Sequence, residues 1–132
     1  MKKLFVLFAL IATTSLFNAS DLKSIPPGAH TFNFGYFSGH ASVSPYNNYN
    51  QNIYITASQA GTFSYYVYFS NYIATSHHFS NQSYGNWSIY FNKVDFFYNG
   101  NLFYTSYNLN DSYSILANVG FRITYTIENN EA

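Results

Sequence analysis

Residues 93–107 read KVDFFYNGNLFYTSY, and this stretch carries the strongest fold signal in the chain. Asn99-Gly100 separates two aromatic-rich runs. A two-residue type I′ turn needs a positive φ at both central positions, and Asn followed by Gly tolerates this best. The stretch therefore predicts a β-hairpin with its tip at Asn99-Gly100.

The turn also fixes a register, which sorts the side chains of the hairpin onto two faces. The predicted opposite pairs are Tyr98 and Asn101, Phe97 and Leu102, Phe96 and Phe103, Asp95 and Tyr104, and Val94 and Thr105. Because side chains alternate between the faces of a strand, one face is expected to be core and the other wetter. The predicted core face carries Val94, Phe96, Tyr98, Phe103 and Tyr107. The predicted wet face carries Lys93, Asp95, Tyr104 and Ser106.

Alternation of apolar and polar residues predicts further strands on both sides of this hairpin. The clearest pattern runs over residues 119–127, where apolar side chains occupy every odd position. Shorter strands are predicted over residues 31–37, 52–57, 62–70, 87–91 and 112–118. Residues 52–57 and 62–70 are expected to form a second hairpin, with 62–70 inside a sheet, whereas 71–86 shows little pattern.

Two places are expected to interrupt the regular ladders. In 31–37 the predicted inward residues are Phe32, Phe34 and Tyr36, and Gly35 suggests a bulge or a close backbone approach. Inward positions are odd over 87–91 but even over 94–98, so the alternation changes phase near Asn92-Lys93. A bulge or a corner between sheets is predicted there.

Several short strands at intervals of about ten residues, with no long helical apolar period, indicate an all-β chain. We predict a single antiparallel β-sandwich of about seven to eight strands over residues 21–132, with a small β-barrel as the alternative. The chain contains no cysteine, so disulfides cannot hold this domain together. Burial of its many aromatic side chains must do so.

The first 20 residues, MKKLFVLFALIATTSLFNAS, have the pattern of a secretory signal peptide. Lys2 and Lys3 precede an apolar run over Leu4–Ala12 that is too short to span a membrane. The expected localisation is secreted, periplasmic or extracellular, with membrane contact only through an uncleaved signal peptide. A retained membrane anchor or a buried helix is the alternative for this segment.

Charge excludes some partners of the mature chain. Without residues 1–20 it has three basic and five acidic residues, a net charge of −2. Nucleic-acid binding requires a basic surface, so no nucleic-acid partner is expected.

Chemistry-bearing motifs are scarce in this sequence. The four histidines (His30, His40, His77 and His78) match no metal-site spacing, and adjacent histidines on a strand point to opposite faces. No GxSxG motif is present, and Asp95 is expected to pair with Lys93 rather than to act in catalysis. We therefore expect a protein that is not an enzyme and that has no metal and no cofactor.

Flat aromatic rings beside Asn and Gln side chains suit sugar binding. The candidate ligand-binding residues are Tyr46, Tyr49, Tyr66, Tyr84 and Trp87, although Trp87 begins an alternating strand and core burial is the favoured role for it. The sequence thus predicts a binding module for carbohydrate or a cell-surface protein that acts through Tyr/Asn-rich loops. The alternative is a structural or adhesin-like subunit that self-assembles by strand addition into a homo-oligomer.

Overall fold

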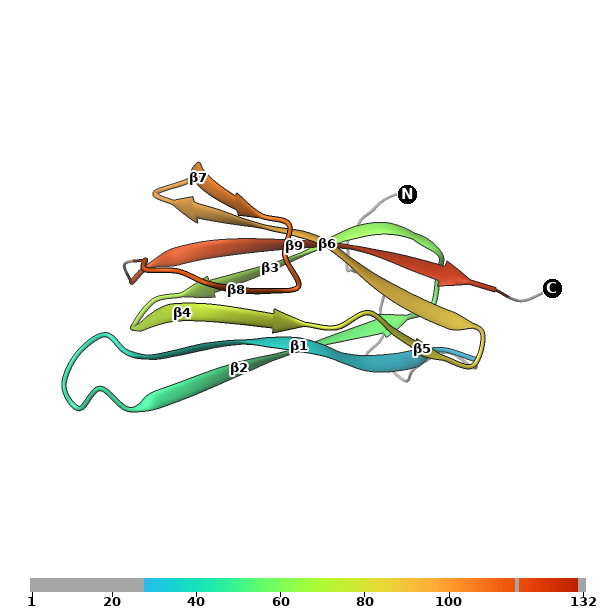
Figure 1. Ribbon diagram of the computed structural model, residues 1–132, viewed down its shortest axis with the longest axis horizontal. Coiled ribbons are helices and arrows are strands. Elements are labelled where there is room, and N and C mark those ends of the chain that lie inside the picture. Colours follow the sequence, from blue (N-terminus) through green and yellow to red (C-terminus); the bar gives the residue numbers. More distant parts are fainter. Residues whose placement is uncertain (1–27, 116, 131–132) are drawn as a thin grey trace, which may run out of the picture.

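The computed structural model describes residues 28–115 and 117–130, and this part of the chain contains nine strands and no helix. The strands are β1 (His30–Ala41), β2 (Asn48–Ala57), β3 (Gly61–Phe69), β4 (Tyr72–Phe79), β5 (Gln82–Tyr84), β6 (Trp87–Tyr98), β7 (Asn101–Ser106), β8 (Asn110–Ser112) and β9 (Val119–Asn129). They form two antiparallel sheets packed face to face, which confirms the predicted β-sandwich (Figure 1). The predicted signal peptide, residues 1–20, lies outside the described residues.

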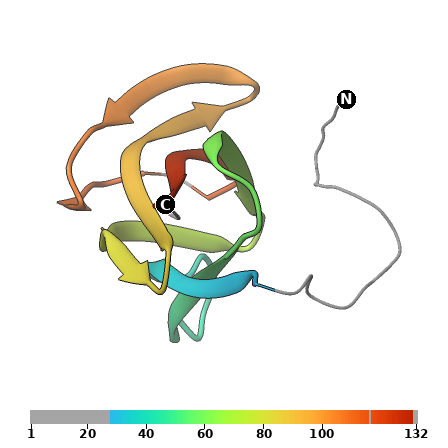
Figure 2. The ribbon, with the colours of Figure 1, turned by 90° about the vertical axis from the view of Figure 1, so that its right-hand side faces the viewer.

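The first sheet has the strand order β2-β1-β4-β8, and the second has the order β3-β9-β6-β5. Figure 2 shows the sandwich nearly end-on, with β6 and β7 of the second sheet in the upper part of the view and β1 and β2 of the first sheet in the lower part. β6 pairs with β9 along its whole length. Its other edge is therefore shared by β5, which pairs near its start, and β7, which pairs near its end.

Aromatic rings fill the space between the sheets. Phe37 of the first sheet packs on Phe121 of the second with ring centroids 4.5 Å apart, and Phe121 also contacts Phe96 at 4.9 Å in an edge-to-face arrangement. Every odd position of β9 from Val119 to Ile127 is buried, as the alternation predicts. Contacts of this kind connect the layers without any disulfide.

Both predicted interruptions of the ladders are present. The β1–β2 register shifts between Asn33 and Gly35, so Phe37 rather than Tyr36 turns into the core. A Cβ atom on Gly35 would lie 2.2 Å from the carbonyl oxygen of His78, which explains the glycine. The β6–β9 register shifts between Phe91 and Lys93, where the alternation changes phase.

The central hairpin has the predicted turn but only part of the predicted register. Asn99 and Gly100 have φ values of 51° and 78°, as a type I′ turn requires. The pairs nearest the turn are correct, but beyond them Phe96 lies opposite Tyr104 because Phe103 is an extra residue in β7. The predicted pairing of Phe96 with Phe103, and each pair beyond it, is therefore wrong by one residue.

This bulge also changes which side chains of the hairpin are buried. Phe103, Tyr98 and Tyr107 are exposed, whereas Asp95 and Ser106, both predicted to be wet, are buried. β7 is an edge strand that pairs only with the second half of β6. Of the residues predicted for the core face of the hairpin, only Val94 and Phe96 are buried.

The predicted second hairpin is wrong. β2 pairs with β1 in the first sheet and β3 pairs with β9 in the second, so the chain crosses between layers at residues 58–60. β3 is an edge strand and not an interior one. The weakly patterned region contains β4, a central strand whose inward residues include Ala74 and His77, and these small and polar residues conceal its alternation.

Candidate functional site

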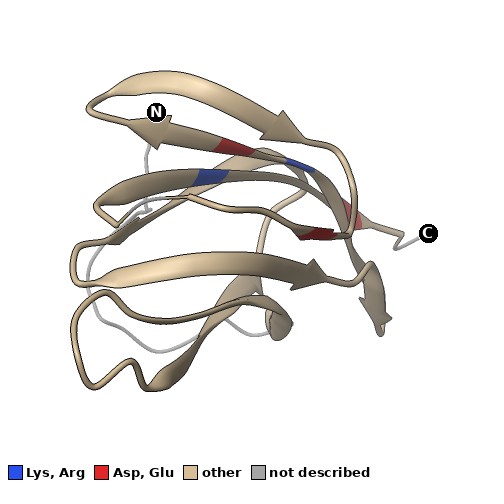
Figure 3. Cartoon of the chain, turned by 60° about the vertical axis from the view of Figure 1, so that its left-hand side comes forward, with Lys and Arg blue, Asp and Glu red and all other residues tan. Residues whose placement is uncertain are grey.

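Charged side chains of the described residues are confined to the later part of the chain. Residues 28–92 contain no Lys, Arg, Asp or Glu. In Figure 3 the strands of the first sheet that lie within this range are accordingly tan, and blue and red bands cross β6 and β9. Lys93, Asp95 and Arg122 meet there, on the outer face of the second sheet.

Cross-strand register brings together side chains from four strands on this face. Arg122 of β9 lies opposite Tyr66 of β3 on one side and Asp95 of β6 on the other. Asp95 in turn lies opposite Thr105 of β7. Directly paired residues on one face of a sheet have Cβ atoms about 5 Å apart, so the four side chains form one continuous row.

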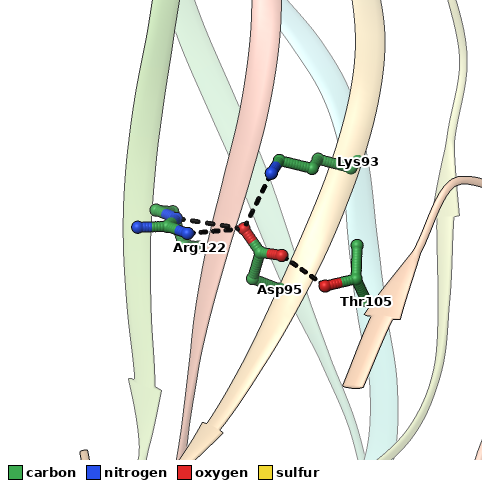
Figure 4. A network of polar contacts seen from close by, with 4 residues as sticks. All are labelled: Lys93, Asp95, Thr105 and Arg122. Carbon is green, nitrogen blue, oxygen red and sulfur yellow. Dashed lines mark hydrogen bonds and ion pairs between the residues drawn. The ribbon is translucent and has the colours of Figure 1, made fainter. Parts of the chain in front are cut away.

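Asp95 is the centre of a polar network in this row (Figure 4). Its Oδ2 atom accepts hydrogen bonds from Nη2 of Arg122 at 2.8 Å and from Nε at 3.1 Å. Oδ1 accepts a hydrogen bond from the Thr105 hydroxyl at 2.6 Å, and Lys93 Nζ lies 3.6 Å from Oδ2. Although Asp95 points away from the core, these neighbours leave only 1% of it exposed.

The network fixes the ionisation state of Asp95. Burial raises the pKa of the carboxyl group, but the hydrogen bonds from Thr105 and Arg122 and the positive charges of Arg122 and Lys93 lower it by more. The resulting pKa lies below the ordinary value of 3.8, so Asp95 is a carboxylate at neutral pH. With Arg122 and Lys93 protonated, the cluster carries one net positive charge.

An aromatic row lies beside the polar one. Gly120 of β9 stands between Tyr68 of β3 and Phe97 of β6 in the register. A Cβ atom on Gly120 would reach ordinary contact with both, at 3.9 Å from the Tyr68 ring and 4.0 Å from Cβ of Phe97. The guanidinium of Arg122 lies 5.1 Å from the Phe97 ring centroid, a cation–π distance.

Together the two rows border an open depression of about 610 Å³. Because Gly120 has no side chain, backbone forms part of its floor, between the rings of Tyr68 and Phe97. Asn99 and Asn118, both with positive φ, also line it and add two side-chain amides. Tyr66 and Tyr68 are 69% and 67% exposed, so their rings are available to a ligand. We call this feature the aromatic depression; its lining includes Tyr66, Tyr68, Phe97, Asn99, Asn118, Gly120 and Arg122.

Only one of the five predicted ligand-binding residues lines the aromatic depression, namely Tyr66. Tyr46 lies in the β1–β2 turn, and Tyr49 lies beside it at the start of β2, where its hydroxyl donates a hydrogen bond to Gln51 at 2.7 Å. That turn is at the opposite end of β1 from β5 and the start of β6, which carry Tyr84 and Trp87 (Figure 1). A strand as long as β1, with 12 residues, spans about 35 Å or more.

At this other end, Tyr84 stacks on His30 with ring centroids 3.9 Å apart. Trp87 packs partly against the core and donates its indole N–H to the carbonyl of Gly28 at 2.6 Å. The five residues therefore occupy three separate places, and ligand binding by Tyr46, Tyr49, Tyr84 and Trp87 stays a prediction.

The four histidines are also dispersed. His77 is buried among aromatic rings, and its Nε2 lies 2.8 Å from the carbonyl oxygen of Asn108. His78 points to the opposite face of β4 and contacts Asn110 at 3.1 Å. Within residues 28–115 and 117–130, no group of three His, Asp or Glu side chains could hold a metal ion.

Comparison with known protein families, curated proteins and solved structures finds no match for this chain. Among the described residues there is also no helix with the length and apolar character needed to span a membrane.

Sequence reasoning did not assign Tyr68, Phe97 and Gly120 to a site, because their proximity arises from pairing between strands distant in the chain. The available signals were the single arginine and the single glycine in the regular pattern of residues 119–127. Both mark the outer face of β9, where the aromatic depression lies.

Proposed function

We propose that this protein is an exported, non-enzymatic module that binds carbohydrate in the aromatic depression. The observation that carries the proposal is the arrangement of Tyr68 and Phe97 on either side of Gly120. Rings beside an open backbone floor can pack against the apolar face of a sugar. The side-chain amides of Asn99 and Asn118 supply hydrogen-bonding groups for its hydroxyls.

The size of the depression supports a small ligand or the end of a larger one. About 610 Å³ lies within the range of small-molecule sites, which are concave, mostly apolar and carry a few polar groups. The pairing of Arg122 with Asp95 holds the arginine in place before a ligand arrives. Preorganisation of this kind reduces the entropy lost on binding.

The chemistry of Asp95 and Asp111 supports binding over hydrolysis. A glycoside hydrolase needs a carboxyl group that keeps a proton near neutral pH to act as general acid. Hydrogen bonds and positive charge lower the pKa of Asp95, while Asp111 has its pKa lowered by hydrogen bonds from Ser106, Asn108 and Ser112. Both are ionised and serve as acceptors within the protein.

A glycan array probed with the purified chain tests the proposal, with Tyr68→Ala and Phe97→Ala as variants. We expect the wild type to bind a defined set of sugars and each variant to bind them at least about tenfold more weakly, equivalent to about 1.4 kcal/mol. Tyr107→Ala is the matched control, because Tyr107 is 72% exposed and does not line the aromatic depression. Unchanged binding by both variants would show that the aromatic depression is not the sugar-binding site.

A further inference from the structure

We infer that a second copy of this chain docks on the free edge of β3, so that the second sheets of two copies join into one continuous sheet. β3 pairs with β9 on one side, and no other described strand pairs with its second edge. An open edge presents unpaired backbone N–H and C=O groups, which are a template for another strand. This inference rests on the edge itself and does not depend on sugar binding.

β3 lacks the features that protect edge strands from pairing. Residues 61–69, GTFSYYVYF, contain no charged residue and no proline. The β3–β9 register continues through nine pairs without a bulge. Lysine, proline and bulges are the usual means by which an edge is kept from adding a partner, and β3 has none of them.

The sequence of β3 complements itself about its central residue. An antiparallel pair of β3 strands with its two-fold axis at Tyr65 places Phe63 opposite Val67 of the second copy on the inner face. Both residues already pack against the core within one copy. On the outer face the same register places Ser64 opposite Tyr66 and Thr62 opposite Tyr68. Aromatic residues thus meet β-branched or small ones, which are favourable cross-strand pairs.

The edge of the first sheet does not have this property. β2 is also uncharged, but its inner face carries Gln51 as well as Ile53 and Ile55. A two-fold axis at Ile53, near the middle of β2, would place Gln51 opposite Ile55, a polar side chain against an apolar one. Pairing over the whole strand is therefore less favourable for β2 than for β3, and self-pairing is assigned to β3.

Pairing through β3 has a geometric consequence for the outer face. A two-fold axis perpendicular to the sheet keeps the outer faces of both copies on the same side. Tyr66 and Tyr68 lie on β3 itself, so the aromatic depressions of the two copies would lie on either side of the axis. If the proposed function is correct, the dimer binds polysaccharide bivalently, and avidity raises its apparent affinity.

Cysteine cross-linking tests the register directly, because the chain has no cysteine of its own. Tyr65 would face its own counterpart at a Cα separation of about 5 Å, within the range of a disulfide. Thr62 and its counterpart would stand about 20 Å apart. We expect mild oxidation to convert Tyr65→Cys into a covalent dimer and to leave Thr62→Cys uncross-linked. Equal yields at the two positions, or no dimer of Tyr65→Cys, would overturn the proposal.

Sedimentation analysis provides a second test that needs no folded cysteine variant. The wild type is expected to dimerise with increasing concentration, and Ser64→Lys, which places a charge on the paired edge, to remain monomeric. Thr56→Lys on the exposed face of β2 is the control and should dimerise as the wild type does. A wild type that is monomeric at every concentration, or a Ser64→Lys variant that still dimerises, contradicts the inference. A monomer that binds sugar would overturn the dimer while leaving the proposed function intact.

Discussion

At the scale of single residues, Asp95 shows how a charge can be buried on the outside of a sheet. Its carboxylate has donors or positive charges on three sides, from Arg122, Thr105 and Lys93. A complete arrangement of this kind contributes little net stability. Removing one partner is strongly destabilising, because the other charge then stays buried without a partner. Asp95 and Arg122 must therefore be considered as one unit.

Replacing Arg122 with leucine should lower the free energy of unfolding by about 2–4 kcal/mol, since Asp95 would lose its closest cation and two hydrogen bonds. Arg122→Lys keeps the charge but not the paired N–H groups, so a smaller loss is expected. Urea denaturation at neutral pH measures both variants. Equal stability of Arg122→Leu and the wild type would show that Asp95 does not depend on this partner.

His77 should make stability depend on pH. Burial lowers its pKa below the ordinary 6.5, although the hydrogen bond to Asn108 and the charge of Asp111 act in the opposite direction. A carbonyl can only accept, so Nε2 carries the proton of the neutral ring and buried Nδ1, which has no partner in the described structure, does not. Protonation would bury a charge and an unpaired N–H.

The direction of this pH dependence follows from the linkage between proton binding and folding. A histidine whose pKa is lower in the folded state binds fewer protons there, so stability falls as the pH decreases below about 6.5. We therefore expect the free energy of unfolding of the wild type to fall between about pH 7.5 and pH 5. His77→Phe should lose distinctly less over the same interval. Denaturation curves of both proteins at the two pH values measure this difference. An equal loss of unfolding free energy in the wild type and in His77→Phe would rule out His77 as the cause.

At the scale of elements, β1 and β4 approach each other closely because β1 carries glycine at two positions. A Cβ atom on Gly39 would lie 2.0 Å from the carbonyl oxygen of Ile73 and 2.9 Å from Cα of Ala74. These are backbone atoms of the neighbouring strand, which cannot move aside as a flexible side chain can. The separation of the two strands is therefore set by this glycine.

Gly39→Ala should consequently disrupt the first sheet, with a loss of more than about 3 kcal/mol or failure to fold. Gly120→Ala is the matched control in a strand of the second sheet, because its added Cβ atom meets only ordinary contacts. Thermal denaturation should show a near-normal transition for Gly120→Ala. Comparable melting of the two variants would mean that the β1–β4 approach is looser than described.

At the scale of the whole molecule, local pattern and long-range pairing differ in how far the sequence predicts them. The buried face of β9, the Asn99-Gly100 turn and the bulges near Gly35 and Asn92-Lys93 all follow from alternation and turn chemistry, which act over a few residues. The partners of β2 and β3 depend on which layer each strand joins, and the sequence between them is short enough to suggest a hairpin.

The same division applies to the candidate site. Tyr66 could be selected from its residue type, because an aromatic ring suits sugar binding. Tyr68, Gly120 and Phe97 become neighbours only through the β3-β9-β6 order. Burial of Asp95 likewise requires Thr105 opposite it, which the extra residue at Phe103 brings about. The polar row depends on three strand pairings. The Asn99-Gly100 turn predicts the pairing of β6 with β7, but the pairings of β9 with β3 and with β6 join strands that are distant in the chain, and alternation does not predict them.

The proposed site lies on a sheet face and not at the Tyr/Asn-rich turn between β1 and β2. Titration calorimetry with the strongest sugar from the array distinguishes these two locations by comparing Tyr68→Ala with a Tyr46→Ala, Tyr49→Ala double variant. We expect affinity to fall about tenfold or more for Tyr68→Ala and to stay within about twofold for the double variant. Normal affinity of Tyr68→Ala together with lost affinity of the double variant would place the site at the turn instead.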